Sequence, residues 1–284
     1  MARKNSERTE TPSGAPASSA LTIEALQEKL LNFPKPVELV DLPSRGKYYP
    51  EGHPLKGKDH IEIRHMTAKD EDILTSKSLL RKGVAIDRLL RSIIIDKSIP
   101  IESILIGDKN ALLVAARVSG YGSDYVTRVT CPNCASTEEV SFDLEDRPVY
   151  EGQDWEGFDI SVTGNGTFNI KLPMSEVIVE VRLLNGADEK RLASLVENKK
   201  KNRLPESTLT DQLNLMIASV EGHTDNSFKK TLIDNMPALD ARYLRKAYQK
   251  LVPTVDLTHR FQCSGCQYDG EMEVPFTTDF FWPK

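Results

Sequence analysis

Four cysteines are the residues of this chain whose types and spacing point most directly to chemistry. All four stand in Cys-x-x-Cys pairs, Cys131 with Cys134 and Cys263 with Cys266, and no cysteine is left over. A Cys-x-x-Cys turn presents two thiolates to one side of an ion, and structural Zn²⁺ takes four such ligands in a tetrahedron. We therefore expect the two pairs to meet and to hold one structural zinc ion per chain.

Other uses of the cysteines stay open. A redox-active pair usually opens a helix, whose N-terminus lowers the thiol pKa. Here each pair lies between strand-like segments, such as Tyr125 to Thr130 and Glu139 to Phe142. Disulfides would need an oxidising compartment, and the N-terminal residues contain no apolar stretch that could serve as a signal-peptide core. We expect a cytosolic protein, with a thiol oxidoreductase as the less favoured alternative.

No other constellation predicts a reaction. The histidines are scattered and lack the spacing of a metalloprotease, and Gly164-Asn-Gly166 is not followed by the Lys-Ser/Thr of a phosphate loop. Two acidic clusters, at 70–72 and 188–189, are explained by the first turns of helices, where carboxylates favour the helix dipole. The sequence therefore predicts a protein that is not an enzyme.

Charge argues against a nucleic-acid-binding protein. The chain of 284 residues has a formal net charge of -5, whereas phosphate backbones reward clustered Lys and Arg. Its one dense basic run, Lys199-Lys-Lys-Asn-Arg203, lies between two predicted helices and lacks interleaved aromatic residues. A zinc-ribbon nucleic-acid-binding protein stays as an alternative, and we expect no membrane association because no apolar run is long enough to span a bilayer.

The elements that would carry the cysteines occur twice. Four blocks match in the same order: 61–74 with 179–192, 105–112 with 232–239, 124–134 with 256–266, and 139–142 with 273–276. In each first block a strand-like segment leads into a capping box, Thr67 with Asp70 and Asn185 with Asp188. We expect an α+β fold of two tandem related units, each a strand, three helices and a strand pair with Cys-x-x-Cys at its turn.

This reading divides the chain into five segments. Residues 1–20 have no large apolar side chain after Met1 and are predicted to be a disordered arm. Residues 21–58 combine an amphipathic helix at 21–33 with an irregular Pro- and Gly-rich loop from Val37. The first repeat unit spans 59–145, a connector hairpin 146–169, and the second unit 170–284, and the shared zinc site joins the two units.

Several of these segments resemble one known family. They are Arg117-Val-Ser-Gly-Tyr-Gly122 at a helix end, a strand leading into Cys131-Pro-Asn-Cys134, the acidic strand after it, and the closing Phe276-Thr-Thr-Asp-Phe-Phe281. Together they resemble the T4-type phage baseplate hub assembly protein family over about residues 37 to 284. This chain departs from the family pattern because it has two recognisable repeats, each with its own Cys-x-x-Cys turn, or knuckle.

The resemblance implies a non-enzymatic role in the tail baseplate of a contractile-tailed phage, as an assembly factor, a chaperone-like protein or a hub component. Its partners would be other baseplate or tail proteins, such as hub or tape-measure proteins. It would be located in the host cytoplasm during assembly and in the baseplate of the virion. The oligomeric state cannot be predicted from these residues.

Overall fold

A computed structural model describes residues 22–23, 26–28, 36–145, 148–205, 207–274 and 278–281. The chain divides into two units, residues 1–35 and 36–284. In the first unit the described residues Ile23 and Leu26 to Glu28 are helical, and Leu26 N donates to Thr22 O at 2.9 Å. The predicted arm at 1–20 and the rest of the predicted helix at 21–33 lie outside the described residues.

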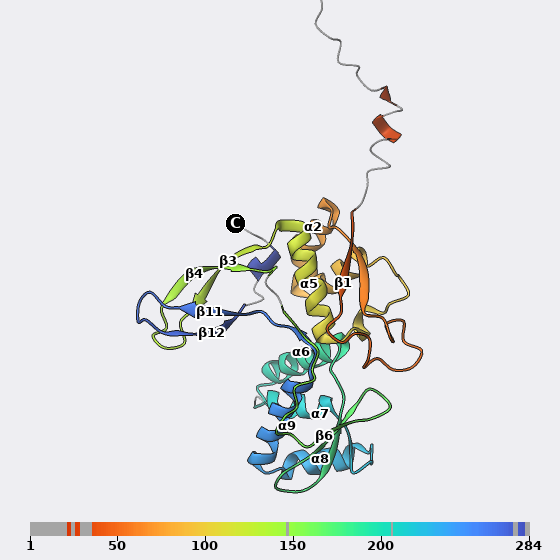
Figure 1. Ribbon diagram of the computed structural model, residues 1–284, viewed down its shortest axis with the longest axis vertical. Coiled ribbons are helices and arrows are strands. Elements are labelled where there is room, and N and C mark those ends of the chain that lie inside the picture. The colour runs from red at the N-terminus through yellow and green to blue at the C-terminus, as the bar shows by residue number, and fades with distance from the viewer. Residues whose placement is uncertain are drawn as a thin grey trace, which may run out of the picture. The chain divides into compact units, whose positions relative to one another are not determined.

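The second unit begins with a β-hairpin that covers one long helix (Figure 1). Its first half, residues 36–145, contains β1 (Val37–Asp41), β2 (His60–Arg64), α2 (Ala68–Thr75), α3 (Lys77–Arg81), α4 (Ala85–Ile93), the 3-10 helix η1 (Ile101–Ser103), α5 (Ile106–Tyr121), β3 (Asp124–Thr130) and β4 (Thr137–Asp143). Helix α5 is buried continuously along its middle, from Ala111 to Arg117, so it forms the centre of this core.

The second half, residues 148–281, repeats part of this order around a larger sheet. It contains β5 (Val149–Tyr150), β6 (Ile160–Val162), β7 (Phe168–Lys171), β8 (Ile178–Val181), α6 (Gly186–Lys201), α7 (Thr208–Met216), β9 (Ile217–Val220), α8 (Asn226–Asn235), α9 (Ala238–Leu251), β10 (Thr254–Val255), β11 (Thr258–Gln262), β12 (Asp269–Glu273) and the 3-10 helix η2 (Thr278–Phe281). Strands β6, β7, β8 and β9 form the sheet in that order.

The named strands pair only antiparallel within the described residues, and helices lie between them in the chain. The fold is therefore mixed, in agreement with the predicted α+β class. Within the same residues, no helix is both long and apolar enough to cross a membrane.

The two halves are joined by backbone hydrogen bonds and a partly buried ion cluster. Ile106 N donates to Leu184 O at 3.1 Å, and Gly186 N donates to Ile104 O at 3.0 Å. Beside these bonds, Lys109 Nζ lies 3.2 Å from an Asp87 carboxylate oxygen and 2.6 Å from one of Glu189. Because Lys109 is almost fully buried, loss of either carboxylate would leave its charge poorly compensated.

Three expectations about elements were wrong in detail. The predicted irregular loop begins with a strand, because Val37–Asp41 pairs along its whole length with β2. Each half contains four α-helices among its described residues rather than three. The basic run from Lys199 is not a loop at its start, because Lys199 to Lys201 form the last turn of α6, where cations favour the helix dipole.

The match of 105–112 with 232–239 was also misplaced. Leu105 immediately precedes α5, whereas Leu232 lies inside α8. Helix α9, which leads to the second cysteine pair as α5 leads to the first, begins only after Pro237. A proline disfavours helix continuation through the residue before it, so α8 ends at Asn235 and a new helix starts.

Candidate metal centre

The first cysteine pair lies at the turn of the β3–β4 hairpin. Side chains alternate along β3, so that Tyr125, Thr127 and Val129 are buried while their neighbours are exposed. The strands pair in continuous register from Asp124 opposite Asp143 to Thr130 opposite Thr137. This register brings the two ends of the Cys131–Ser136 turn together, and Cys131 N donates to Ser136 O at 2.8 Å.

The second pair lies at an equivalent turn of the β11–β12 hairpin. Cys263 N donates to Tyr268 O at 2.8 Å, and Gln267 N donates to Cys263 O at 3.0 Å, which reproduces the bond from Ala135 N to Cys131 O at the same length. Ala135 and Gln267 both have a φ of 58°, in the left-handed region that is uncommon for residues other than glycine. The two turns therefore share an unusual backbone conformation.

The two hairpins lie side by side although one comes from the middle of the unit and the other from near its C-terminal end (Figure 1). One ring contact connects them, because Phe142 packs edge-on against His259 with centroids 5.3 Å apart. Tyr125 of the first hairpin also packs edge-on against Phe280 of η2, at 5.2 Å. Glu138 adds a polar contact across the gap, because its carboxylate accepts from Ser264 N at 3.0 Å. The turns are thus brought together by contacts that do not need an ion.

Arg117 fixes the first hairpin to the helical core. The side chain is fully buried, and its guanidinium donates to Gly122 O at 2.6 Å and to Asp124 O at 2.9 Å. It also lies over the rings of Tyr121 and Tyr125. Burial lowers the pKa of Arg117, yet these carbonyl and aromatic contacts favour its charged form. The direction of β3 is therefore set at the end of α5.

Four sulfur atoms meet between the turns. Cys131 Sγ lies 3.7 Å from Cys266 Sγ, and Cys134 Sγ lies 3.7 Å from Cys263 Sγ, so each close contact joins one hairpin to the other. All four lie within 4.8 Å of one another, and all four cysteines are free. A disulfide needs about 2.05 Å between sulfurs. The structure thus brings together all four residues that the sequence proposed.

The surroundings give the thiols unequal acidity. Hydrogen bonds from Ser136 lower the pKa of Cys134 to about 6. For Cys263 the Ser136 hydroxyl also acts to lower the pKa, but the neighbouring Glu138 carboxylate and burial outweigh it and raise the pKa to about 12. Asn133 Nδ2 lies 3.4 Å from Cys266 Sγ, where it can donate to the thiolate.

The cluster has the dimensions of a tetrahedral metal site. With sulfur about 2.3 Å from Zn²⁺, the edges of a regular tetrahedron are about 3.8 Å long, close to the shorter sulfur separations here. Thiolates are soft ligands that suit Zn²⁺ and not Mg²⁺ or Ca²⁺. The residues present therefore fit a metal ion held by four thiolates.

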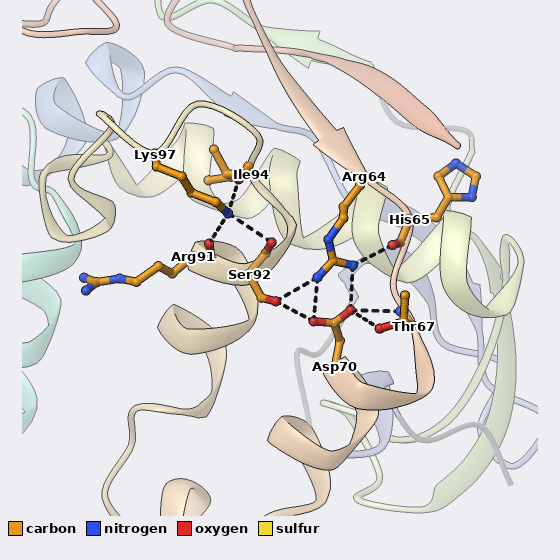
Figure 2. A network of polar contacts seen from close by, with 8 residues as sticks. All are labelled: Arg64, His65, Thr67, Asp70, Arg91, Ser92, Ile94 and Lys97. Atoms are coloured by element: carbon orange, nitrogen blue, oxygen red, sulfur yellow. Dashed lines mark hydrogen bonds and ion pairs between the residues drawn. The ribbon is translucent and has the colours of Figure 1, made fainter. Parts of the chain in front are cut away.

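A separate network of polar contacts in the first half connects β2 to the helices that follow it (Figure 2). Arg64 on β2 forms two hydrogen bonds with the Asp70 carboxylate, at 2.7 and 3.0 Å, and Asp70 also accepts from Thr67 N and from Ser92 Oγ. Burial acts to raise the pKa of Asp70, but these donors hold it well below its usual range. In the same view Lys97 donates to the carbonyls of Arg91, Ser92 and Ile94, and so caps α4.

The second half contains an equivalent arginine–aspartate pair, and we call the two pairs the clamps. Arg182, directly after β8, forms two hydrogen bonds with Asp188, at 2.7 and 2.6 Å, and Asp188 accepts from Asn185 N at 3.1 Å. Burial opposes ionisation here too, but the arginine and the backbone donor leave the pKa of Asp188 lowered. Both predicted capping boxes are therefore confirmed, and the acidic clusters have the helix-starting role that the sequence suggested.

Other residues considered from the sequence do not join the cysteines. Within the described residues the metal-ligand cluster contains cysteines alone, and no histidine takes part. In the basic run, Lys199 contacts Asp211 and Lys201 pairs with Glu197 at 2.7 Å. Much of that positive charge is therefore already neutralised.

Sequence reasoning missed Arg117, Ser136 and Glu138 as residues that shape the site. Glu138 had a visible signal, because it lies on the same strand as the matched Glu139 to Phe142 block. Its contact with the other hairpin, however, joins residues that are 126 positions apart and has no local pattern.

Comparison with known proteins gives one match. No curated protein and no solved structure was found to match the chain. A family model described as T4 bacteriophage base plate protein matches residues 37–282, which include both clamps, both hairpins and all four cysteines. Because this match covers most of the sequence, it confirms the resemblance to T4-type baseplate proteins. The chain belongs to the T4 bacteriophage base plate protein family.

Proposed function

We propose that the protein is a non-enzymatic component of the phage tail baseplate hub or of its assembly, and that it acts through protein–protein contacts. One observation carries the structural part of this proposal: four thiols from two distant hairpins converge within 4.8 Å in a chain that matches the baseplate family. Its partners would be other baseplate or tail proteins, such as hub or tape-measure proteins. It would meet them in the host cytoplasm and remain with them in the tail.

In this proposal Cys131, Cys134, Cys263 and Cys266 hold one Zn²⁺ per chain. Four thiolates complete the tetrahedron and leave no position for water or substrate, which is the arrangement of structural and not catalytic zinc. The ion would hold the two hairpins together, and it would relieve the conflict between Cys263 and the nearby Glu138 by stabilising the thiolate.

We also propose that the two halves are related units produced by duplication, with boundaries near 59–145 and 170–284 and a connector hairpin at 146–169. Three pairs of features support this. The Arg–Asp clamps are equivalent, the cysteine turns share a positive φ at the same place, and one antiparallel strand in each unit, β2 or β8, leads into the clamped helix. The joined halves would present a rigid surface to partners.

The test is the metal content of freshly purified, reduced protein, measured by elemental analysis and native mass. We expect one zinc per chain and four thiols protected from alkylation. Cys263→Ser should lose the metal and lower the unfolding temperature. Ser264→Ala on the same turn should retain the metal and the wild-type unfolding temperature. Metal-free wild-type protein with freely reacting thiols would refute the zinc site and favour the oxidoreductase alternative.

The baseplate role is tested separately by deleting the gene from the phage genome. We expect particles that lack complete baseplates, and rescue by the wild-type chain supplied in trans. Normal infectious tails without the protein would contradict the role, whatever the metal content.

A further inference from the structure

A groove between α7 and α9 has no role in the metal centre or the clamps. Its volume is about 400 Å³. The side chains that line it are Leu209, Gln212, Leu213, Met216, Arg242, Arg245, Lys246, Tyr248 and Gln249. It therefore has an apolar floor from α7 and a polar rim from α9.

The rim of the groove is entirely positive among its charged residues. Arg242, Arg245 and Lys246 are exposed, and in the described part of the chain none of them forms an ion pair. Arg245 Nε donates to Ala241 O of the same helix, at 3.2 Å. On the floor, Leu209 remains 54% exposed. Such a groove fits a segment that presents an apolar side chain between carboxylates.

The outer face of the β3–β4 hairpin has this chemistry. Asp124 and Asp143 lie directly opposite each other, both exposed, and neither has a cationic partner among the described residues. Like charges in directly opposite positions destabilise a strand pair. The next outward residue on β3 is Val126, which is 60% exposed and lies opposite Ser141. The face thus offers an apolar side chain beside two unpaired carboxylates.

The charge of the surrounding segments supports the match. Residues 124–145 and 256–274, which form the two hairpins, contain nine carboxylates and two arginines. A four-thiolate zinc site would add further negative charge, since four thiolates exceed the charge of the ion. The hairpins are therefore strongly acidic, and the α9 rim is their natural counterpart.

We infer that the protein associates with itself head to tail, with the Asp124–Asp143 face of one copy in the α7–α9 groove of the next. Every copy carries both surfaces, and the two surfaces differ, so the contact is heterologous and propagates into a closed ring or an open chain. This inference goes beyond the proposed function and requires neither the metal nor the baseplate match to be correct. Because one groove is smaller than the interface of a stable dimer, the association should be weak and sensitive to salt.

The test is sedimentation velocity of the full-length protein over a concentration series at about 50 mM and about 500 mM salt, where screening differs strongly. We expect association at low salt that is lost at high salt. The groove variant Arg242→Glu with Lys246→Glu and the face variant Asp124→Lys with Asp143→Lys should each remain monomeric. Their equimolar mixture should associate again in alternation, because the unchanged Asp face fits the unchanged groove and the Lys face fits the Glu groove. The chain with all four changes should associate again.

Controls separate this contact from general effects of charge. Lys200→Glu with Arg203→Glu changes the charge equally at exposed positions of the same half and should still associate. Asp143 Oδ1 also accepts from Glu145 N, so Asp124→Lys alone serves as a milder variant, with a partial loss expected. Thermal unfolding shows whether each variant is folded. A wild type that stays monomeric at low salt, or a fourfold variant that does not recover, would overturn the inference.

Discussion

Asp70 and Asp188 are the carboxylates on which each half depends most directly. Each is buried and accepts hydrogen bonds from an arginine at the end of the preceding strand or directly after it, and from the backbone N–H at the start of its own helix. Each therefore connects a strand to a helix through one side chain. The sequence could reveal this role because all the partners of Asp188, and most of those of Asp70, lie within six residues.

Their titration sets an expected pH dependence. Both carboxyls have a lower pKa in the folded chain than the ordinary value of about 3.9. The stabilisation is therefore complete above that value and is lost as the pH falls towards the folded pKa. We expect the contribution of these two carboxylates to the free energy of unfolding, measured by chemical denaturation, to be level between about pH 7 and 5 and to decrease below about pH 4.

Asp70→Asn should remove part of that acid sensitivity and cost about 3 kcal/mol at neutral pH, because it leaves Arg64 without its carboxylate. Asp72→Asn is the matched control on the exposed side of α2 and should change stability by less than about 0.5 kcal/mol. Comparing the two variants in the same metal state removes the contribution of the cysteines. Equal losses would show that the clamp is not important for stability.

Among the elements, α5 shows what local patterns can and cannot predict. Its apolar residues and the strand after it could be predicted, because both follow regular periodicities. Its role in holding the loop after β1 could not. Asp108, fully buried in its first turn, accepts from Ser44 N, Ser44 Oγ and Tyr49 Oη, residues about 60 positions earlier. Burial raises the pKa of Asp108 despite these donors.

The strand β1 and the helix α8 were both missed, each for a physical reason of its own. β1 is short and mostly exposed, so its strand character depends on pairing with β2, about 20 residues away. α8 is only ten residues long and has no fully buried residue, because Leu232 and Ile233 pack only partly against the core and Phe228 is exposed. By contrast, the turns that hold the cysteines are complete within a few residues and were visible from spacing alone.

Gly107 should be essential to the packing of α5. A Cβ added there would lie 1.8 Å from Pro253 O, so the backbone after α9 approaches the helix too closely for any side chain. Gly107→Ala should therefore destabilise the protein by about 3 kcal/mol, although alanine favours helix by about 1 kcal/mol. Gly164→Ala, with open space around it, is the control and should be nearly neutral in the same denaturation experiment. A stabilised Gly107→Ala would mean that the segment after α9 moves aside easily.

At the scale of the whole molecule, the halves are held by two separate groups of contacts. One combines the backbone and ion contacts around Lys109 with the packing of α5 against β10, and the other is the pair of hairpins with the thiol cluster. Because α5 packs against β1, α6 and β10, which lie outside the thiol cluster, its burial should not depend on the second group. Stability is then expected to be local, with the hairpins opening before the helical core.

Metal removal tests this separation. If zinc is bound, a chelator should increase amide hydrogen exchange in β3, β4, β11 and β12 and leave α5 almost unchanged. Mass spectrometry of peptides from protein with and without chelator would measure both in one experiment. Cys263→Ser should give the same pattern without chelator. Faster exchange throughout the chain would show that the cluster controls global unfolding instead.

The separation of the two cysteine pairs also has a consequence during synthesis. Cys134 and Cys263 are 129 positions apart, so a ribosome adding about 5 to 20 residues per second makes the second knuckle roughly 6 to 26 s after the first. Until then a nascent chain offers only two thiols, which hold a metal ion far less firmly than four. A prematurely terminated chain can never complete the set. A bound ion would therefore show that translation had reached the C-terminal hairpin. Incomplete chains would enter assembly without a bound ion.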